Sequence, residues 1–191
     1  GCLQLFATVG ACYALSMVRG RKNPLHYGLP SRLRKARKTA GLSRKAVVQK
    51  VGAGQTAVRD IETNQRLPTV ATIARLASAL NVSAAHLAYG LGEPTSDSTA
   101  ANTDDMGARL QAVRVDCSMS RAELARLTEL SPGTVAKIEG GGSSGVHVVE
   151  ALAQALGVSP GWLAFGEGPK VLPPTRRGRP RSAPVSPDPA G

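Results

Sequence analysis

Apolar residues recur every three or four positions along two stretches of the chain, and cap-forming residues divide both stretches into short segments. This spacing places the apolar side chains on one face of an α-helix. No strictly alternating run supports a β-strand. In the first stretch we therefore expect helices over residues 31–40, 44–51, 55–62, 70–80 and 84–89.

The second stretch repeats the first. A shift of 77 residues aligns identical residues at many positions, among them Arg32, Arg37, Ser43 and Glu62 with Arg109, Arg114, Ser120 and Glu139. After a one-residue deletion before Val70, the shift becomes 76 and continues to Gly90 and Gly166. A fixed period indicates a duplicated structural unit. We expect an all-α protein with two tandem five-helix domains, unit one at residues 28–92 and unit two at residues 105–168.

Three segments lie outside these units. Residues 1–27 show no clear structural pattern and are left out of the fold prediction. Gln4 and several glycines and alanines interrupt their apolar part, which argues against a membrane span. Residues 93–104 are small and polar, which predicts a flexible linker. Residues 169–191 combine prolines with a basic cluster, which predicts a disordered tail.

Capping signals mark several helix starts. In unit one the N-cap candidates are Ser43 and Ser83. In unit two, Ser120 and Glu123 form a capping box, and Ser131 and Ser159 each precede a proline at the first helical position. Only three or four residues separate the second and third helices of each unit. This is the spacing of a helix-turn-helix.

Several motifs in these helices point to one family. Unit one contains Ser43-Arg-Lys-Ala-Val-Val-Gln-Lys-Val, Val58-Arg-Asp-Ile-Glu and Leu80-Asn-Val-Ser. Unit two contains Ser120-Arg-Ala-Glu-Leu-Ala, Ser131-Pro-Gly-Thr-Val-Ala-Lys-Ile-Glu and Leu156-Gly-Val-Ser. These motifs resemble the lambda-repressor-like, or Xre/Cro, helix-turn-helix family. The resemblance covers about two thirds of the chain and implies two DNA-binding domains without catalytic activity.

The chain departs from the family pattern at a few positions. Val48 stands where the family usually has alanine, and Asn64 where it usually has glycine. The loop after the third helix of unit two is the glycine-rich segment 140–145. We expect a tighter helix contact at Val48 and a more flexible loop in unit two.

The charge is concentrated in unit one. The whole chain carries a formal net charge of +11. Unit one contributes +9, from 11 basic and 2 acidic residues, whereas unit two has 5 basic and 7 acidic residues and a charge of −2. Because duplex DNA is a polyanion, unit one is the better electrostatic partner for it. The plainer alternative is that the charges form a solvated face.

The resemblance implies DNA-contacting residues in unit one. It places Gln55, Thr56, Arg59 and Asp60 at the start and on the exposed side of the recognition helix, and Arg44 at the beginning of the preceding helix. Glutamine can pair with adenine and arginine with guanine in the major groove, although ordinary helix surface is the plainer interpretation. The candidate phosphate contacts are Lys35, Lys38, Lys45 and Arg66.

Unit two offers fewer polar groups at the equivalent positions. Pro132 and Gly133 have no polar side chain, so base contacts there depend on Arg121, Thr134 and Lys137. Unit two either adds a weaker half-site or serves as an association surface through which two chains pair as a homodimer.

Two Arg and Glu pairs have a structural interpretation. The resemblance implies that Arg37 with Glu62, and Arg114 with Glu139, form internal salt bridges between the first and third helices. We therefore do not interpret them as catalytic pairs.

The tail contains a second candidate DNA-binding element. Its segment Arg176-Arg-Gly-Arg-Pro-Arg resembles an AT-hook, in which Arg177 and Arg179 would enter the minor groove of A·T-rich DNA. Nonspecific attraction to phosphate is the alternative.

The sequence argues against other classes. Three cysteines without a Cys-x-x-Cys pair give neither a disulfide framework nor a zinc site, which favours a reducing compartment. The glycine motifs of segment 140–145 follow a helix, whereas a dinucleotide fingerprint or a nucleophile elbow follows a strand. We expect no metal, no cofactor, no membrane partner and no enzymatic activity.

The leading hypothesis is a sequence-specific, DNA-binding transcriptional regulator whose partner is double-stranded DNA, located in the cytoplasm at the nucleoid. A protein-interaction adaptor that uses its helix-turn-helix units for assembly is the alternative. An enzyme is a distant third.

Overall fold

The computed structural model describes residues 24–54, 56–94 and 103–171. In these residues all regular structure is helical, apart from one isolated β-bridge between Thr69 and Gly145. Unit one comprises η1 (Leu25–Gly28), α2 (Leu29–Thr39), α3 (Arg44–Val51), α4 (Ala57–Glu62), α5 (Val70–Leu80) and α6 (Ala84–Tyr89). Unit two comprises α7 (Met106–Asp116), α8 (Arg121–Leu127), α9 (Pro132–Glu139), α10 (Val146–Leu156) and α11 (Pro160–Phe165).

The predicted caps are confirmed. The Ser43 hydroxyl accepts a hydrogen bond from Ala46 N, and Ser120 forms a complete capping box with Glu123. Two helix starts differ from the prediction. The first long helix begins at Leu29 rather than 31, since Pro30 fixes the backbone of its first turn. The third begins at Ala57 rather than 55, where no side chain caps it.

Six backbone positions with positive φ recur in both units. Four of the six pairs combine glycine with another residue type, which shows that the two units follow the same path with different sequences. The pairs are Gly41 with Ser118, Gly52 with Glu129, Asn64 with Gly141, Asn81 with Gly157, Gly90 with Gly166, and Gly92 with Gly168. Asparagine enters this left-handed region more easily than most residues, which explains how Asn64 takes a family glycine position.

The helix-turn-helix of each unit is held by a small apolar core. In unit one, Val47 and Val58 are buried on the faces that α3 and α4 turn toward each other. Leu124 and Val135 occupy the same positions in unit two. Val48, where the family usually has the smaller alanine, is buried as well.

The two units pack against each other about a pseudo-twofold axis. Val70 N donates to Ser144 O at 2.9 Å, and Val146 N donates to Pro68 O at 3.2 Å. Each of these bonds is the repeat equivalent of the other, and the β-bridge joins the equivalent residues Thr69 and Gly145. Such a reciprocal contact is the signature of a twofold interface, here formed within one chain.

Helices α6 and α11 form the apolar part of this interface. Tyr89 and Phe165, which are equivalent in the repeat, lie with ring centroids 6.4 Å apart. Ala85 faces its own equivalent Gly161, where an added Cβ would lie 2.7 Å from the Ala85 methyl. The buried Tyr89 hydroxyl donates to Val146 O at 3.0 Å. The two units therefore share one continuous core.

Two carboxylates of unit two make the interface asymmetric. Glu150 is 2% exposed and accepts hydrogen bonds from Leu25 N at 2.6 Å and from His26 N at 3.1 Å. Its Oε2 also lies 2.7 Å from His26 Nδ1, within hydrogen-bond distance. Glu167 accepts from the Ser83 hydroxyl at 2.6 Å and from two backbone N–H groups at the start of α6. Free N–H groups at helix starts favour such anions.

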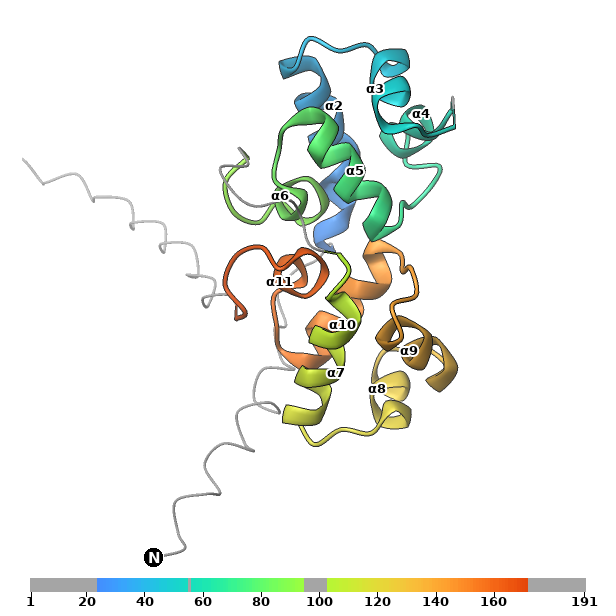
Figure 1. The fold of residues 1–191 in the computed structure, drawn as a ribbon, viewed down its shortest axis with the longest axis vertical. Helices are drawn as coiled ribbons and strands as arrows, with labels where there is room; N and C mark the ends of the chain where they lie inside the picture. Colours follow the sequence, from blue (N-terminus) through green and yellow to red (C-terminus); the bar gives the residue numbers. More distant parts are fainter. Residues whose placement is uncertain (1–23, 55, 95–102, 172–191) are drawn as a thin grey trace, which may run out of the picture.

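The interface sets where the helix-turn-helix elements face. In Figure 1, α3 and α4 lie at the upper right and α8 and α9 at the lower right, while α6 and α11 meet on the opposite side. Both recognition helices, α4 and α9, are therefore exposed on one side of the molecule. The two units predicted from the sequence thus form one body, and the expected boundary between residues 27 and 28 falls inside η1.

No described helix combines the length and apolar character that crossing a bilayer requires.

The interface predicts a specific loss of stability. Glu150→Gln replaces an acceptor-only carboxylate by an amide that also presents donors to the N–H groups of Leu25 and His26. We expect it to lower the free energy of unfolding by about 1–3 kcal/mol in urea titrations. Glu129→Gln, the same change at an exposed site, serves as the control and should shift stability by less than about 0.5 kcal/mol. Equal effects of the two changes would contradict the role given to Glu150.

Candidate nucleic-acid interface

The helix-turn-helix of unit one joins α3 to α4 through residues 52–56. Gly52 ends α3 with φ of +64°, a left-handed conformation that turns the chain sharply. On α4, Arg59 is exposed and Asp60 is half-buried, and Thr56 is exposed at the N-cap. Gln55 lies outside the described residues, as do Arg177 and Arg179.

A buried carboxylate fixes α4 against α2 and α3. The Glu62 side chain is fully buried and receives Arg37 Nε at 2.7 Å on one oxygen and Arg44 Nε at 2.7 Å on the other. Burial alone raises the pKa of the Glu62 carboxyl, but the hydrogen bonds and charges of the two guanidinium groups outweigh it, so its pKa lies below the usual value.

Unit two contains the same arrangement. Glu139 receives Arg114 Nε at 2.6 Å and Arg121 Nε at 2.6 Å. The pKa of the Glu139 carboxyl is also lowered, because the two arginines again outweigh the effect of burial. The predicted internal salt bridges of both units are thus present, and each carboxylate holds one more arginine than the sequence analysis expected.

The additional arginines are two of the predicted DNA contacts. Arg44 and Arg121 each donate Nε to a buried carboxylate, while their side chains stay 46% and 49% exposed. Each therefore has a structural role in joining the second and third helices. About half of each side chain is still exposed to solvent, so the position remains compatible with a contact to an anion.

The other predicted cations of unit one are exposed. The side chains of Lys35, Lys38, Lys45, Arg59 and Arg66 make no hydrogen bond or ion pair with any other residue that the structure describes. Their charge is therefore not used within the described part of the fold. Basic side chains around a helix-turn-helix are the groups that contact phosphates.

The repeat separates structural cations from surface cations. Arg32, Arg37 and Arg44 are conserved between the units as Arg109, Arg114 and Arg121, and all six bond inside the fold. The exposed cations of unit one have neutral counterparts in unit two: Arg34 with Gln111, Lys35 with Ala112, Lys38 with Val115, Lys45 with Ala122, Lys50 with Leu127, Arg59 with Ala136, and Arg75 with Ala151.

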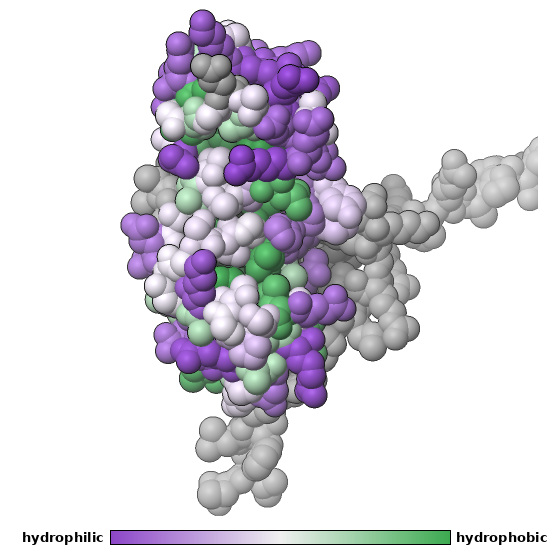
Figure 2. Space-filling model, turned by 90° about the vertical axis from the view of Figure 1, so that its right-hand side faces the viewer, coloured by the Kyte–Doolittle hydropathy of each residue, from purple (hydrophilic) through white to green (hydrophobic). Residues whose placement is uncertain are grey.

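Figure 2 views the molecule from the side that carries the helix-turn-helix elements. Its upper part, formed by unit one, is mostly hydrophilic, whereas the lower part mixes hydrophilic with neutral and apolar residues. The two recognition helices thus share a side of the molecule but differ in the chemistry around them.

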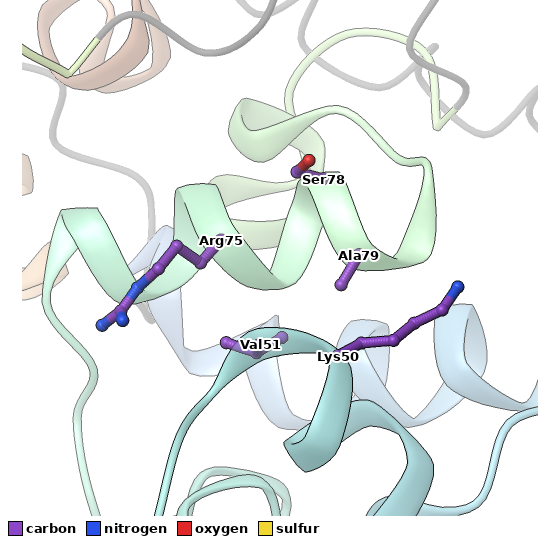
Figure 3. A pocket seen from close by; sticks show the side chains of 5 residues that line it. All are labelled: Lys50, Val51, Arg75, Ser78 and Ala79. Atoms are coloured by element: carbon purple, nitrogen blue, oxygen red, sulfur yellow. The ribbon is translucent and has the colours of Figure 1, made fainter.

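A shallow groove of about 420 Å³ extends the positive surface of unit one. It lies between α3 and α5, and its lining residues are Lys50, Val51, Arg75, Ser78 and Ala79. In Figure 3, Lys50 and Arg75 extend toward opposite ends of the groove. Their charges do not converge on one point, so the groove adds positive potential without forming a small-ligand site.

The residues that the structure describes contain no group of three or more His, Cys, Asp or Glu side chains able to hold a metal ion. Trp162 is half-buried, and Lys170 Nζ lies 5.5 Å from the centroid of its ring. Its neighbours Leu163 and Phe165 are buried.

The lowered pKa of Glu62 predicts an acid-sensitive stability. A carboxyl whose pKa is lower in the folded state stabilises the fold above its unfolded pKa, about 4.3, and loses this contribution as the pH falls through the folded value. Glu62→Gln leaves Arg37 and Arg44 without their carboxylate, and we expect it to cost about 3 kcal/mol at neutral pH. It should also flatten the decline in stability below pH 4, measured by thermal unfolding across pH. An unchanged acid profile would contradict this interpretation.

The comparisons agree with this geometry. The chain matches the family described as helix-turn-helix domain twice, over residues 29–89 and 105–164. These ranges cover α2 to α6 and α7 to α11. A comparison with curated proteins found no match. Since the two matches together span more than half of the sequence, the chain belongs to the helix-turn-helix domain family, in two tandem copies.

Proposed function

We propose that the protein is a sequence-specific, DNA-binding transcriptional regulator in which unit one supplies most of the binding. Membership of the helix-turn-helix family supports DNA binding in general terms. The observation that carries the proposal is the contrast between the units. The arginines that bond inside the fold recur in both units, whereas most exposed cations around the helix-turn-helix of unit one have neutral counterparts in unit two.

This contrast has a physical explanation. A cation that bonds inside the fold is needed wherever the fold is repeated. A surface cation without an internal partner can be replaced at little cost to the stability of the fold. Six such cations of unit one have neutral counterparts in unit two: Lys35, Lys38, Lys45, Lys50, Arg59 and Arg75. An external anion explains their concentration around one helix-turn-helix. Duplex DNA binds largely by releasing counterions to such side chains.

Sequence reading is assigned to the start and the exposed side of α4. Arg59 can donate two hydrogen bonds to guanine, and such a pair discriminates against other bases by about 1–3 kcal/mol. Gln55 and Thr56 are its proposed neighbours at the helix start. Lys35, Lys38, Lys45 and Arg66 are proposed to contact phosphates and to position α4 without reading sequence.

An adaptor that uses the units only for protein assembly remains the second candidate. The observation that favours it is the intramolecular interface, because α10 and α11 of unit two already serve association. The distinction is electrostatic. An adaptor has no need for the unpaired cations of unit one.

The first test is the salt dependence of DNA binding. The triple variant Lys35→Ala, Lys38→Ala, Lys45→Ala should bind mixed genomic DNA more weakly and lower the slope of log K against log salt by about 3, since each phosphate contact contributes about 0.9. Fluorescence anisotropy from 50 to 300 mM salt gives both values. Lys170→Ala, beside α11 on the opposite side from α4, should leave the slope nearly unchanged. No binding by the intact chain at low salt contradicts the proposal.

The basic tail is proposed to add minor-groove contacts through Arg177 and Arg179. A chain that ends at residue 171 should then lose more affinity for A·T-rich duplexes than for G·C-rich duplexes of equal length, because the narrow A·T minor groove has the more negative potential. Competition binding with the two duplexes measures this. A uniform loss would leave only nonspecific phosphate attraction.

A further inference from the structure

The first two residues of the recognition helix of unit two have no hydrogen-bonding side chain. The Ser131 hydroxyl accepts from Thr134 N at 3.1 Å and lies 2.9 Å from the Thr134 hydroxyl. These two hydroxyls therefore satisfy each other and the helix end. At the positions of Gln55 and Thr56, unit two has Pro132 and Gly133.

The exposed face of α9 is small and largely apolar. Pro132, Gly133 and Ala136 are exposed, and Lys137 is the one exposed cation of α9. A Cβ added at Gly133 would meet only the Ser131 hydroxyl, at 3.8 Å. Packing inside the chain thus leaves room for a larger residue at position 133. Because Gly133 has no side chain, the backbone of α9 can approach another molecule closely.

The interface between the units holds this face beside α4. Equivalent backbone groups are hydrogen-bonded across the pseudo-twofold axis, and α6 packs on α11, so α4 and α9 are exposed on the same side (Figure 1). When α4 lies in one major groove, α9 is held at high effective concentration near the same duplex. Unit two then needs few phosphate contacts of its own.

One feature of the major groove matches small apolar side chains. Every base pair presents hydrogen-bonding groups there, but thymine alone presents a methyl group, which alanine and other apolar atoms contact. The exposed carbons of Pro132 and Ala136 offer that kind of contact, and Gly133 gives the approach it requires.

We propose that one copy of the chain binds a DNA site with two unequal halves, and that α9 of unit two reads its half through thymine methyl groups. This inference rests on the proposed function of unit one. Unit one supplies charge and hydrogen bonds, and unit two adds apolar selectivity. The chain acts as its own dimer, so the association surface of unit two is used inside the chain rather than between chains.

The test uses the intact chain and a duplex obtained by selection from a random pool. Replacing thymine by deoxyuridine removes only the methyl group. In the half protected by unit two, each contacted thymine replaced should weaken binding roughly threefold, on the order of the burial of one methyl group. Gly133→Leu should weaken binding to the thymine duplex and abolish the deoxyuridine effect. Ala108→Glu, at an exposed alanine of α7, is the control and should leave both unchanged.

The outcomes separate this inference from the proposed function. One chain per duplex in sedimentation, with two protected grooves and a deoxyuridine effect in one half, supports it. Three results would overturn the inference: a single protected groove, two chains per duplex, or no effect of either deoxyuridine or Gly133→Leu. In each of these cases, salt-dependent binding would still support the function proposed for unit one. No duplex binding at low salt overturns both.

Discussion

The contact between the two units on the pseudo-twofold axis determines where both helix-turn-helix elements face. Two reciprocal backbone hydrogen bonds join Pro68 and Val70 to their repeat equivalents Ser144 and Val146. These bonds and the packing of α6 on α11 together fix the relative orientation of the units. That orientation exposes α4 and α9 on the same side and buries α6 against α11. A duplicated sequence thereby becomes one binding body instead of two independent modules.

The carboxylates at this contact make the interface specific for pairing unit one with unit two. Glu150 and Glu167 of unit two bind the beginnings of η1 and α6, and their repeat equivalents in unit one are Ala74 and Leu91. Two copies of unit two would lack the matching partner groups, including His26, whose equivalent is Thr103. The asymmetry therefore favours pairing of unit one with unit two over pairing of like units.

Most helices of the fold could be predicted from local sequence signals, whereas the candidate nucleic-acid interface could be predicted only in part. Caps such as Ser43 and Ser131 bond within three residues, and for that reason the helix starts could be predicted. The salt bridges to Glu62 and Glu139 followed from the family resemblance. Arg44 was predicted as a DNA contact only. The sequence does not show that Arg37 Nε bonds one oxygen of the Glu62 carboxylate and that Arg44 Nε bonds the other.

The packing of the units could not be predicted in the same way. Glu150 contacts residues about 125 positions away, and no local pattern relates them. One signal was available in the repeat itself, because a glutamate in the apolar face of α10 takes the place of Ala74 in α5. A buried charge that appears in only one copy of a repeat indicates a partner outside that copy.

The most direct measurement of the central claim is the selection of bound fragments from a random duplex pool with the intact chain. We predict two enriched blocks about one helical turn apart, the block under unit one being the better defined. Recovery of fragments without any enriched sequence would contradict the proposed binding.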